Sequence, residues 1–264
     1  MYAFNLQRAT TAAEAARLAA TGARPLAGGQ TLVTAMKLRI AQVDSVVDLG
    51  GVAELAGIGR HGNALRVGAM TRHATVAASA EVQQAIPALA DLAGHIGDRQ
   101  VRTMGTLGGS LANNDPAACY PAAVLGLGAT VHTTSRAIAA DDFFVAVFTT
   151  ALGDGELITA VDFPLPRRAA YVKFRQPASR FALIGVFVAQ FETGVRVAVT
   201  GGGSGVFRHA GLERALNASF TPNAAASVPI DPTGLASDLH GSAEYRASLI
   251  GVMAQRAVAR AMGA

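Results

Sequence analysis

Cysteine is almost absent from this sequence, since Cys119 is the only one in 264 residues. A single cysteine excludes an internal disulfide framework and any multi-cysteine zinc or iron–sulfur site in this chain. If the protein works with such a centre, a partner must supply it. Tryptophan is absent and aromatic residues make up only 6% of the chain, so much of its 51% apolar content consists of small side chains.

Long hydrophobic runs and basic clusters are also missing. Residues 116–131 and 181–191 are the most apolar segments, and they are too short or too interrupted to cross a bilayer. The first twenty residues lack the basic start, apolar core and cleavage site of a secretory signal. We therefore expect a cytoplasmic location and leave association with the inner face of the membrane open. The net charge of +4 is spread without interleaved aromatics, which argues against a nucleic-acid partner.

Catalytic signatures are the third absence. The sequence contains no G-x-S-x-G elbow and no H-E-x-x-H motif, and its six histidines are scattered without metal-binding spacing. We therefore predict no catalytic side chain and no metal ligand in this chain. Paired carboxylates for acid–base chemistry stay open at this stage.

The pattern of helices and strands predicts an α+β chain in three parts, covering residues 1–52, 53–168 and 169–264. The first begins with a helix over 12–20, followed by an extended segment, a glycine pair, a helix over 31–39 and a strand over 45–49. The other two parts are predicted to contain the strands 55–59, 64–68, 156–163, 171–175, 181–191 and 195–201 and helices starting at 71, at 86 and at 242.

The last three strands are predicted to form a three-stranded antiparallel meander that is covered by helices. In the final helix, over 242–262, apolar side chains recur at helical spacing. A helix with one apolar stripe is typical of a layer that covers a sheet. The residues of the predicted stripe are Tyr245, Leu249, Val252, Met253 and Ala257.

Residues 57–62 read GIGRHG and match the dinucleotide-binding pattern G-x-G-x-x-G. That site needs a strand before the glycines and a helix after them, so that a pyrophosphate lies at the helix N-terminus. Here residues 63–67 read as the second strand of a hairpin. We therefore predict a hairpin turn and no dinucleotide site at this position.

Two other glycine pairs have hydroxyl or amide side chains beside them. They lie in residues 28–31 (GGQT) and 106–110 (TLGGS). Successive backbone N–H groups in such loops can surround phosphate oxygens, and hydroxyl groups add donors. Each loop can equally be a tight turn. From the residues alone, a phosphate ligand is one possibility and a pair of ordinary turns is the other.

Three further features have two readings each. Residues 113–116 (NNDP) fit an Asx turn at a helix start and also a site for a ribityl chain. Phe181 opens an apolar strand, where it fits a core position or a ring stacked on a cofactor. Lys173 fits a surface strand position or a contact with a cofactor.

Taken together, these segments resemble the medium, FAD-binding subunit of molybdenum hydroxylases of the carbon monoxide dehydrogenase and xanthine dehydrogenase type. The resemblance spans nearly the whole chain. Its landmarks are residues 26–32 (LAGGQTL), 36–39 (MKLR), 97–102 (GDRQVR), 105–116 (GTLGGSLANNDP), 148–151 (FTTA), 155–158 (GELI), 181–186 (FALIGV) and 242–246 (SAEYR).

The resemblance implies a two-lobed FAD-binding domain, similar to that of vanillyl-alcohol-oxidase-type flavoproteins, followed by a small C-terminal lobe with the three-stranded sheet and helices. FAD is expected between the first two lobes, with its diphosphate at residues 27–31 and 106–110. Phe181, Ile158 and Lys173 are expected near the flavin ring. The implied cofactor-binding residues are Leu26, Ala27, Gly28, Gly29, Gln30, Thr31, Leu32, Val101, Thr106, Gly108, Gly109, Ser110, Asn113, Asp115, Ile158, Lys173 and Phe181.

The sequence departs from the family pattern at two places. The family usually has an aspartate after Pro-Ala-Ala that accepts hydrogen bonds from the cofactor, and here Cys119 stands there. A thiol is a weak donor and a weak acceptor, so we expect Asp115 or water to take over this role. The segment 201–205 is also shorter than in many family members.

By the same resemblance, the chain is an oxidoreductase subunit that relays electrons. The organic substrate reacts at a molybdopterin centre in a large subunit, [2Fe–2S] clusters in a small subunit carry the electrons, and FAD in this chain passes them to an external acceptor. The expected assembly is a dimer of heterotrimers. Two alternatives are a free-standing flavin oxidase and a non-enzymatic scaffold subunit that has lost FAD. The substrate and the acceptor are not identified by the sequence.

Overall fold

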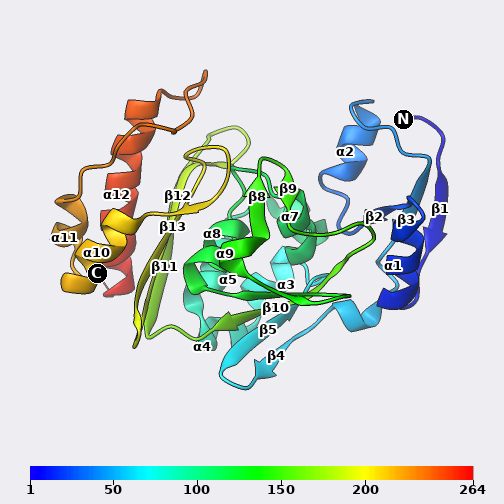
Figure 1. Ribbon diagram of the computed structural model, residues 1–264, viewed down its shortest axis with the longest axis horizontal. Coiled ribbons are helices and arrows are strands. Elements are labelled where there is room, and N and C mark those ends of the chain that lie inside the picture. Colours follow the sequence, from blue (N-terminus) through cyan, green and yellow to red (C-terminus); the bar gives the residue numbers. More distant parts are fainter. Residues whose placement is uncertain (264) are drawn as a thin grey trace.

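The computed structural model describes residues 1–263, which form three parts arranged side by side along the long axis of the molecule (Figure 1). The N-terminal part lies at one end and the C-terminal helices lie at the other. The largest cluster of buried apolar side chains lies in the central part and extends to the third part through Tyr171 and Phe187.

The first part contains a small parallel sheet with the strand order β1-β3-β2. Parallel neighbours need crossover connections, and the helices provide them. Thr11 caps the first helix, since its side chain accepts a hydrogen bond from the Glu14 N–H. The elements are β1 (Asn5–Arg8), α1 (Ala12–Ala20), β2 (Arg24–Leu26), α2 (Leu32–Lys37) and β3 (Ser45–Asp48).

The second part is a five-stranded antiparallel sheet, β4-β5-β10-β6-β7, with helices packed on it and a separate hairpin, β8-β9. Its first elements are η1 (Ala53–Leu55), β4 (Ile58–His61), β5 (Ala64–Gly68), α3 (His73–Ala78), α4 (Ala80–Ala85), α5 (Pro87–Gly94), α6 (Arg99–Met104) and α7 (Leu107–Asn113). The remaining elements are α8 (Tyr120–Leu127), β6 (Thr130–Thr133), β7 (Ala137–Ala139), α9 (Ala140–Phe143), β8 (Phe144–Ala146), β9 (Thr149–Thr150) and β10 (Ile158–Pro164).

The segment that matches G-x-G-x-x-G is a hairpin, as predicted. Strands β4 and β5 pair in antiparallel register, with His61 opposite Ala64, and Gly62 in the turn has a φ of +59°. No helix follows the glycines. The expected strand over 55–59 was wrong at its start, because Leu55 ends the short helix η1 and Gly57, with a φ of +132°, interrupts the extended backbone before β4.

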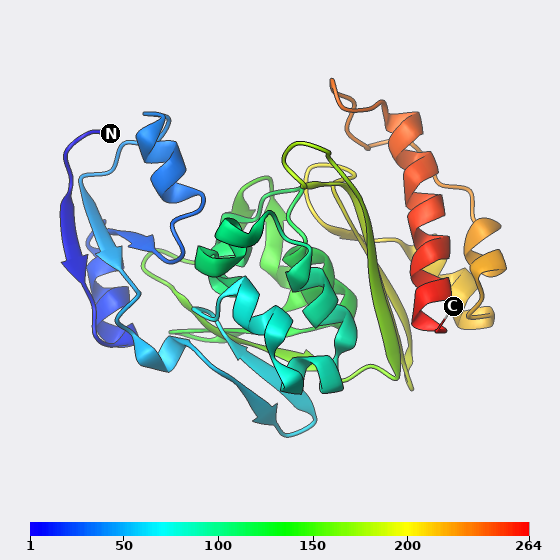
Figure 2. The same cartoon turned by 180° about the vertical axis from the view of Figure 1, so that it is seen from behind.

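The third part is an antiparallel sheet between the second part and a layer of helices (Figure 2). Phe187 and Ala189 on β12 face the core of the second part, whereas Ile184, Val186 and Val188 face the helices. Both faces of the central strand are therefore buried. The elements are β11 (Arg168–Arg175), β12 (Ala182–Phe191), β13 (Gly194–Thr200), β14 (Phe207–Arg208), α10 (Ala210–Ala218), α11 (Pro222–Ala226) and α12 (Ala243–Ala261).

Two details of this part differ from the sequence prediction. The sheet has four strands, since the two-residue strand β14 pairs with β13 beyond the predicted three. The predicted stripe on α12 was wrong at Tyr245 and Val252, which are 44% and 36% exposed. The helix instead turns Ile250, Ala254 and Val258 toward the sheet. Because many side chains of this helix are small, the sequence did not show which face of the helix is buried.

The hydrophobic core of the first part includes side chains from beyond residue 52. Leu55 and Leu157 are buried in the same cluster as Val47 and Leu49. A division at residue 52 therefore stays a prediction about domain boundaries. Within residues 1–263, no helix combines the length and the apolar character that a membrane span requires.

Candidate functional site

The two glycine loops predicted to hold phosphate lie against each other. A side chain at Gly28 would collide with the backbone oxygen of Met104 and would come within 2.7 Å of the Cα of Gly105. A Cβ at Gly109 would lie 3.3 Å from the Cβ of Ala27. Figure 2 shows the loop before α2, in blue, reaching toward the helices of the second part. The first part therefore meets the second at its glycines.

The first loop presents a row of backbone donors. Leu26 ends β2, Gly29 turns the chain with a φ of +71°, and α2 starts at Leu32. Within residues 1–263, no hydrogen-bond acceptor is paired with the N–H groups of residues 28–32. Thr31 offers no side-chain cap either. Consecutive N–H groups of this kind, at a helix start, are suited to bind an anionic oxygen.

The second loop is different, because its backbone N–H groups are already engaged. Leu107 donates to the Thr71 oxygen, Gly108 donates to the Ala69 oxygen, and Gly109 donates to the Thr106 hydroxyl. Gly108 also needs its small size, since a Cβ there would lie 2.6 Å from that of Ala69. Hydroxyl groups are thus the donors that this loop keeps free. Ser110, which is partly exposed, is the most accessible of them.

Asn114, which the sequence reasoning passed over between Asn113 and Asp115, organises the next loop. Its backbone is left-handed with a φ of 44°, and its side-chain amide donates to the carbonyls of Ala146 and Thr149, both at 2.8 Å. This ties the hairpin β8-β9 to the end of α7. Asn113 is partly exposed, whereas Asn114 is buried.

The Asp115 carboxylate forms an Asx turn, since its Oδ1 accepts a hydrogen bond from the Ala117 N–H at 2.8 Å. Its second oxygen has no partner among residues 1–263. Cys119 is buried, and its sulfur lies 3.4 Å from the Lys173 nitrogen. One carboxylate oxygen of Asp115 is therefore free to accept a hydrogen bond from a ligand.

Phe181 lies outside the core. It precedes β12 and is 51% exposed, so the core reading of this residue was wrong. Lys173 is tethered, since its ammonium group donates to the backbone oxygens of His95 and Arg180, both at 2.8 Å. It therefore joins strand β11 to the loop that precedes α6 and to the loop that carries Phe181.

Three other candidate residues, Val101, Ile158 and Gln30, belong to the first two parts of the chain. Val101 lies on α6, one helical turn before the Met104 oxygen that meets Gly28, and it is partly exposed. Ile158 begins β10 and is 6% exposed. The Gln30 side chain donates to the Gly28 oxygen at 3.3 Å and so stiffens the first loop. Assignment of these residues to a cofactor stays a prediction.

His73 lies next to the contact between the two glycine loops. Its backbone N–H donates to the Gly105 oxygen at 2.9 Å, and its ring packs on that of Tyr120, with centroids 5.2 Å apart. Burial, with a smaller contribution from the guanidinium of Arg102, lowers the pKa of His73 to about 4. The ring is therefore neutral in the folded protein at neutral pH.

We predict that this histidine makes the fold sensitive to acid. Because its unfolded pKa is near 6.5, the unfolded chain binds a proton below that pH, and the folded chain does so only near pH 4. Stability is therefore lost as the pH falls through this window. Between pH 7.5 and 5 the loss from this group should be about 2 kcal/mol. Urea unfolding of the wild type and of His73→Phe at both pH values measures it, and equal losses in the two proteins would refute it.

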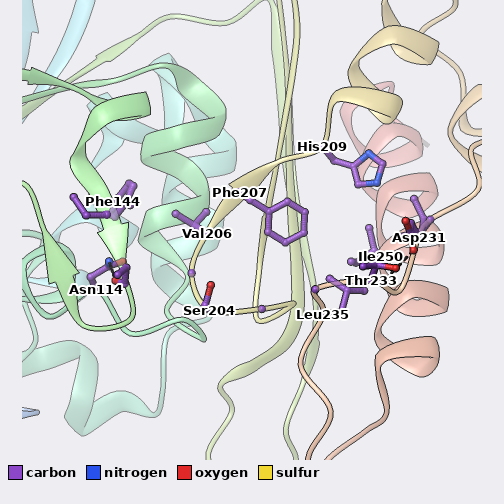
Figure 3. Close-up of a pocket in the computed structure, with 16 residues that line it drawn as sticks. Asn114, Phe144, Ser204, Val206, Phe207, His209, Asp231, Thr233, Leu235 and Ile250 are labelled. Atoms are coloured by element: carbon purple, nitrogen blue, oxygen red, sulfur yellow. Dashed lines mark hydrogen bonds between the residues drawn. The ribbon is translucent and has the colours of Figure 1, made fainter.

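A cavity of about 310 Å³ lies elsewhere, between the hairpin β8-β9 and the C-terminal part (Figure 3). Asn114, Phe144 and Val206 line one side, and Leu235 and Ile250 line the other. Of the predicted site residues, none contributes to it. Within residues 1–263, no group of three histidine, cysteine or acidic side chains is arranged to hold a metal ion.

The family model "FAD binding domain in molybdopterin dehydrogenase" matches residues 2–166. The chain is 36% identical over 250 residues to the nicotine 6-hydroxylase medium subunit of Paenarthrobacter nicotinovorans, covering 89% of this chain and 88% of the relative. It is 34% identical over 263 residues to the carbon monoxide dehydrogenase medium chain of Afipia carboxidovorans, covering 90% and 88%.

The fold is also similar to solved structures. A carbon monoxide dehydrogenase from Hydrogenophaga pseudoflava that lacks the Mo-pyranopterin moiety of its molybdenum cofactor superposes with a TM-score of 0.93 at 31% identity, covering 99% of this chain and 98% of that one. Quinoline 2-oxidoreductase from Pseudomonas putida 86 superposes with a TM-score of 0.91 at 28% identity, covering 99% and 98%.

Proposed function

Because this chain belongs to the family of FAD-binding domains of molybdopterin dehydrogenases, we propose that it works as an electron-transfer subunit, passing electrons from the [2Fe–2S] clusters of a partner to an external acceptor. The family match and the similar proteins confirm four predictions made from the sequence. These are the family, the α+β fold, the oxidoreductase class and FAD as the cofactor. The direction of electron flow and the partners are the proposed part.

One observation carries the proposal, namely the contact between the two glycine loops. Five uncommitted N–H groups, at residues 28–32, lie on one side of this contact, and the hydroxyl of Ser110 lies on the other. This set of donors fits a diphosphate. FAD, when bound, supplies the redox chemistry, and the residues of the chain hold and orient it. Ile158 and Phe181 would provide apolar contacts for the ring, and Asp115 would accept from its hydroxyl groups.

The proposed partners are a large molybdopterin subunit and a small [2Fe–2S] subunit, in a dimer of heterotrimers located in the cytoplasm. The relatives named as a medium subunit, a medium chain and a complex subunit alpha support a multi-subunit assembly. The chain holds a single cysteine, Cys119, so it cannot bind such a cluster by itself.

Cys119, which stands where the family usually has an aspartate, favours a scaffold that has lost FAD, but other observations argue against both alternatives. A free-standing oxidase needs a substrate pocket beside the flavin, and the cavity next to Asn114 contains none of the residues proposed to contact the ring. A scaffold that has lost FAD has no need for an open row of donors, which residues 28–32 keep.

The test uses the complete complex, with and without FAD, and needs no knowledge of the substrate. The clusters are reduced with dithionite and the complex is mixed rapidly with an uncharged benzoquinone. We expect fast reoxidation of the clusters in the FAD-containing complex, at least tenfold slower reoxidation in the FAD-free complex, and recovery when FAD is added back. Equal rates in both forms would show that electrons do not pass through this chain.

A further inference from the structure

Four large apolar side chains are exposed together at one end of the C-terminal sheet. Phe174, Phe181, Leu239 and Tyr245 are 38%, 51%, 89% and 44% exposed. The Phe174 and Tyr245 rings meet edge to face at 6.4 Å. Figures 1 and 2 both show the turn between β11 and β12 and the loop before α12 projecting at the same end of the molecule.

A hydrogen bond joins these two loops, since the Gln176 side-chain amide and the His240 Nδ1 are 2.7 Å apart. The Phe181 carbonyl accepts a hydrogen bond from the Gln176 N–H at 2.9 Å. The exposed apolar side chains therefore belong to one connected surface. Singly scattered apolar residues are ordinary on a protein surface, whereas a group of this kind marks a contact site.

This surface carries two exposed arginines. Arg175 and Arg180 are exposed, and within residues 1–263 neither is paired with a carboxylate, although the Arg180 guanidinium donates to the Gly97 oxygen at 3.4 Å. The nearby Asp238 carboxylate already accepts two hydrogen bonds from Arg246. The other acidic neighbours are Asp98, which follows Gly97 and accepts a hydrogen bond from the Val101 N–H at 2.8 Å, and Glu244, which lines a separate cavity. Arg175 and Arg180 are therefore exposed cations that are available to an acidic partner.

We propose that Phe174, Arg175, Arg180, Phe181, Leu239 and Tyr245, named here the aromatic–arginine surface, bind an acidic protein that accepts electrons from this chain. Aromatic and arginine side chains together form the energetic centres of protein interfaces, and four apolar anchors exceed what a small anion needs. The inference rests on the proposed function, because Phe181 links this surface to the flavin site.

The transfer balances with a one-electron haem acceptor. FAD, when bound and fully reduced, would supply two electrons and two protons, so that two ferric haems would become ferrous and the protons would pass to water. The surface makes no bond to either reactant. Its task is to bring an acidic partner close to the ring, which raises the association rate at low ionic strength.

The experiment compares two haem proteins of opposite charge as electron acceptors for the reduced holocomplex. An acidic protein of the cytochrome b5 type is the probe, and basic cytochrome c is its counterpart. We expect Arg175→Glu with Arg180→Glu to slow reduction of the acidic probe by about tenfold or more at low salt, and to speed reduction of the basic one. The control double variant, Arg60→Glu with Arg256→Glu, changes the same charge at exposed positions elsewhere and should match the wild type.

Two results would overturn the inference. Acidic and basic probes could be reduced equally fast by the wild type, with no dependence on ionic strength. The Arg175→Glu and Arg180→Glu variant could instead lose the small subunit during size-exclusion chromatography, which would make this surface a contact inside the complex. Reduction of an uncharged benzoquinone separates these results from failure of the proposed function, because a working flavin relay reduces it in all variants.

Discussion

Alanine at Gly28 is expected to yield a folded chain that contains little or no FAD. The added Cβ would meet the backbone oxygen of Met104 and the Cα of Gly105. These atoms cannot easily retreat, because the Gly105 N–H donates to the Val101 oxygen at 2.7 Å and its oxygen accepts from His73. The two loops must therefore move apart. The N–H groups of residues 28–32 would then no longer be positioned to bind the diphosphate. Overpacking of this kind costs about 1–3 kcal/mol, so the melting temperature should fall as well.

The ratio of FAD to protein in the purified complex, with the melting temperature, measures this effect. Gly59→Ala is the matched control, since a Cβ at Gly59 meets no atom within 4 Å. We expect it to keep both FAD and stability, although it lies in the motif that resembles a dinucleotide site. A Gly28→Ala protein with a full complement of FAD would place the diphosphate elsewhere.

Arg246 is expected to be the largest single contributor to the stability of the C-terminal part. It is 4% exposed, and one nitrogen of its guanidinium donates to the Leu183 and Gly201 oxygens at 3.0 and 2.6 Å. The other donates to both carboxylate oxygens of Asp238 at 2.8 and 2.9 Å. Arg246→Met keeps the bulk but leaves these acceptors without a donor, so the free energy of unfolding should fall by about 3 kcal/mol.

Chemical denaturation of the two proteins measures this change. Arg256→Met is the control, because Arg256 is exposed on the same helix and should change the free energy of unfolding by less than about 0.5 kcal/mol. A loss below 1 kcal/mol for Arg246→Met would contradict the structural role, since one unsatisfied buried group alone costs about that much.

Much of the fold could be predicted because local patterns and the final structure agree. The hairpin at residues 57–62 follows from the alternation that comes after the glycines, and the antiparallel meander follows from three apolar runs with turn residues between them. The helix α12 was predicted within one residue at each end, because Ser242 caps it. These signals are local, and tertiary packing reinforces them.

Features that depend on contacts between distant segments could not be predicted. Nothing near Gly28 in the sequence indicates that Met104 lies against it. The two glycine loops look alike as sequences, yet only the first keeps its N–H groups free, because the second is held by the distant carbonyls of Ala69 and Thr71. Phe181 looked like a core residue because it adjoins an apolar strand, and the turn between β11 and β12 instead carries it to the surface.

The most direct test of the account is the identity and amount of cofactor in the complex purified with its partner subunits. The visible absorption spectrum, followed by identification of the released cofactor, gives both. We expect FAD at about one per chain, together with iron–sulfur absorption from a partner. A chain without flavin that takes up no added FAD would contradict the central claim and would favour the scaffold alternative.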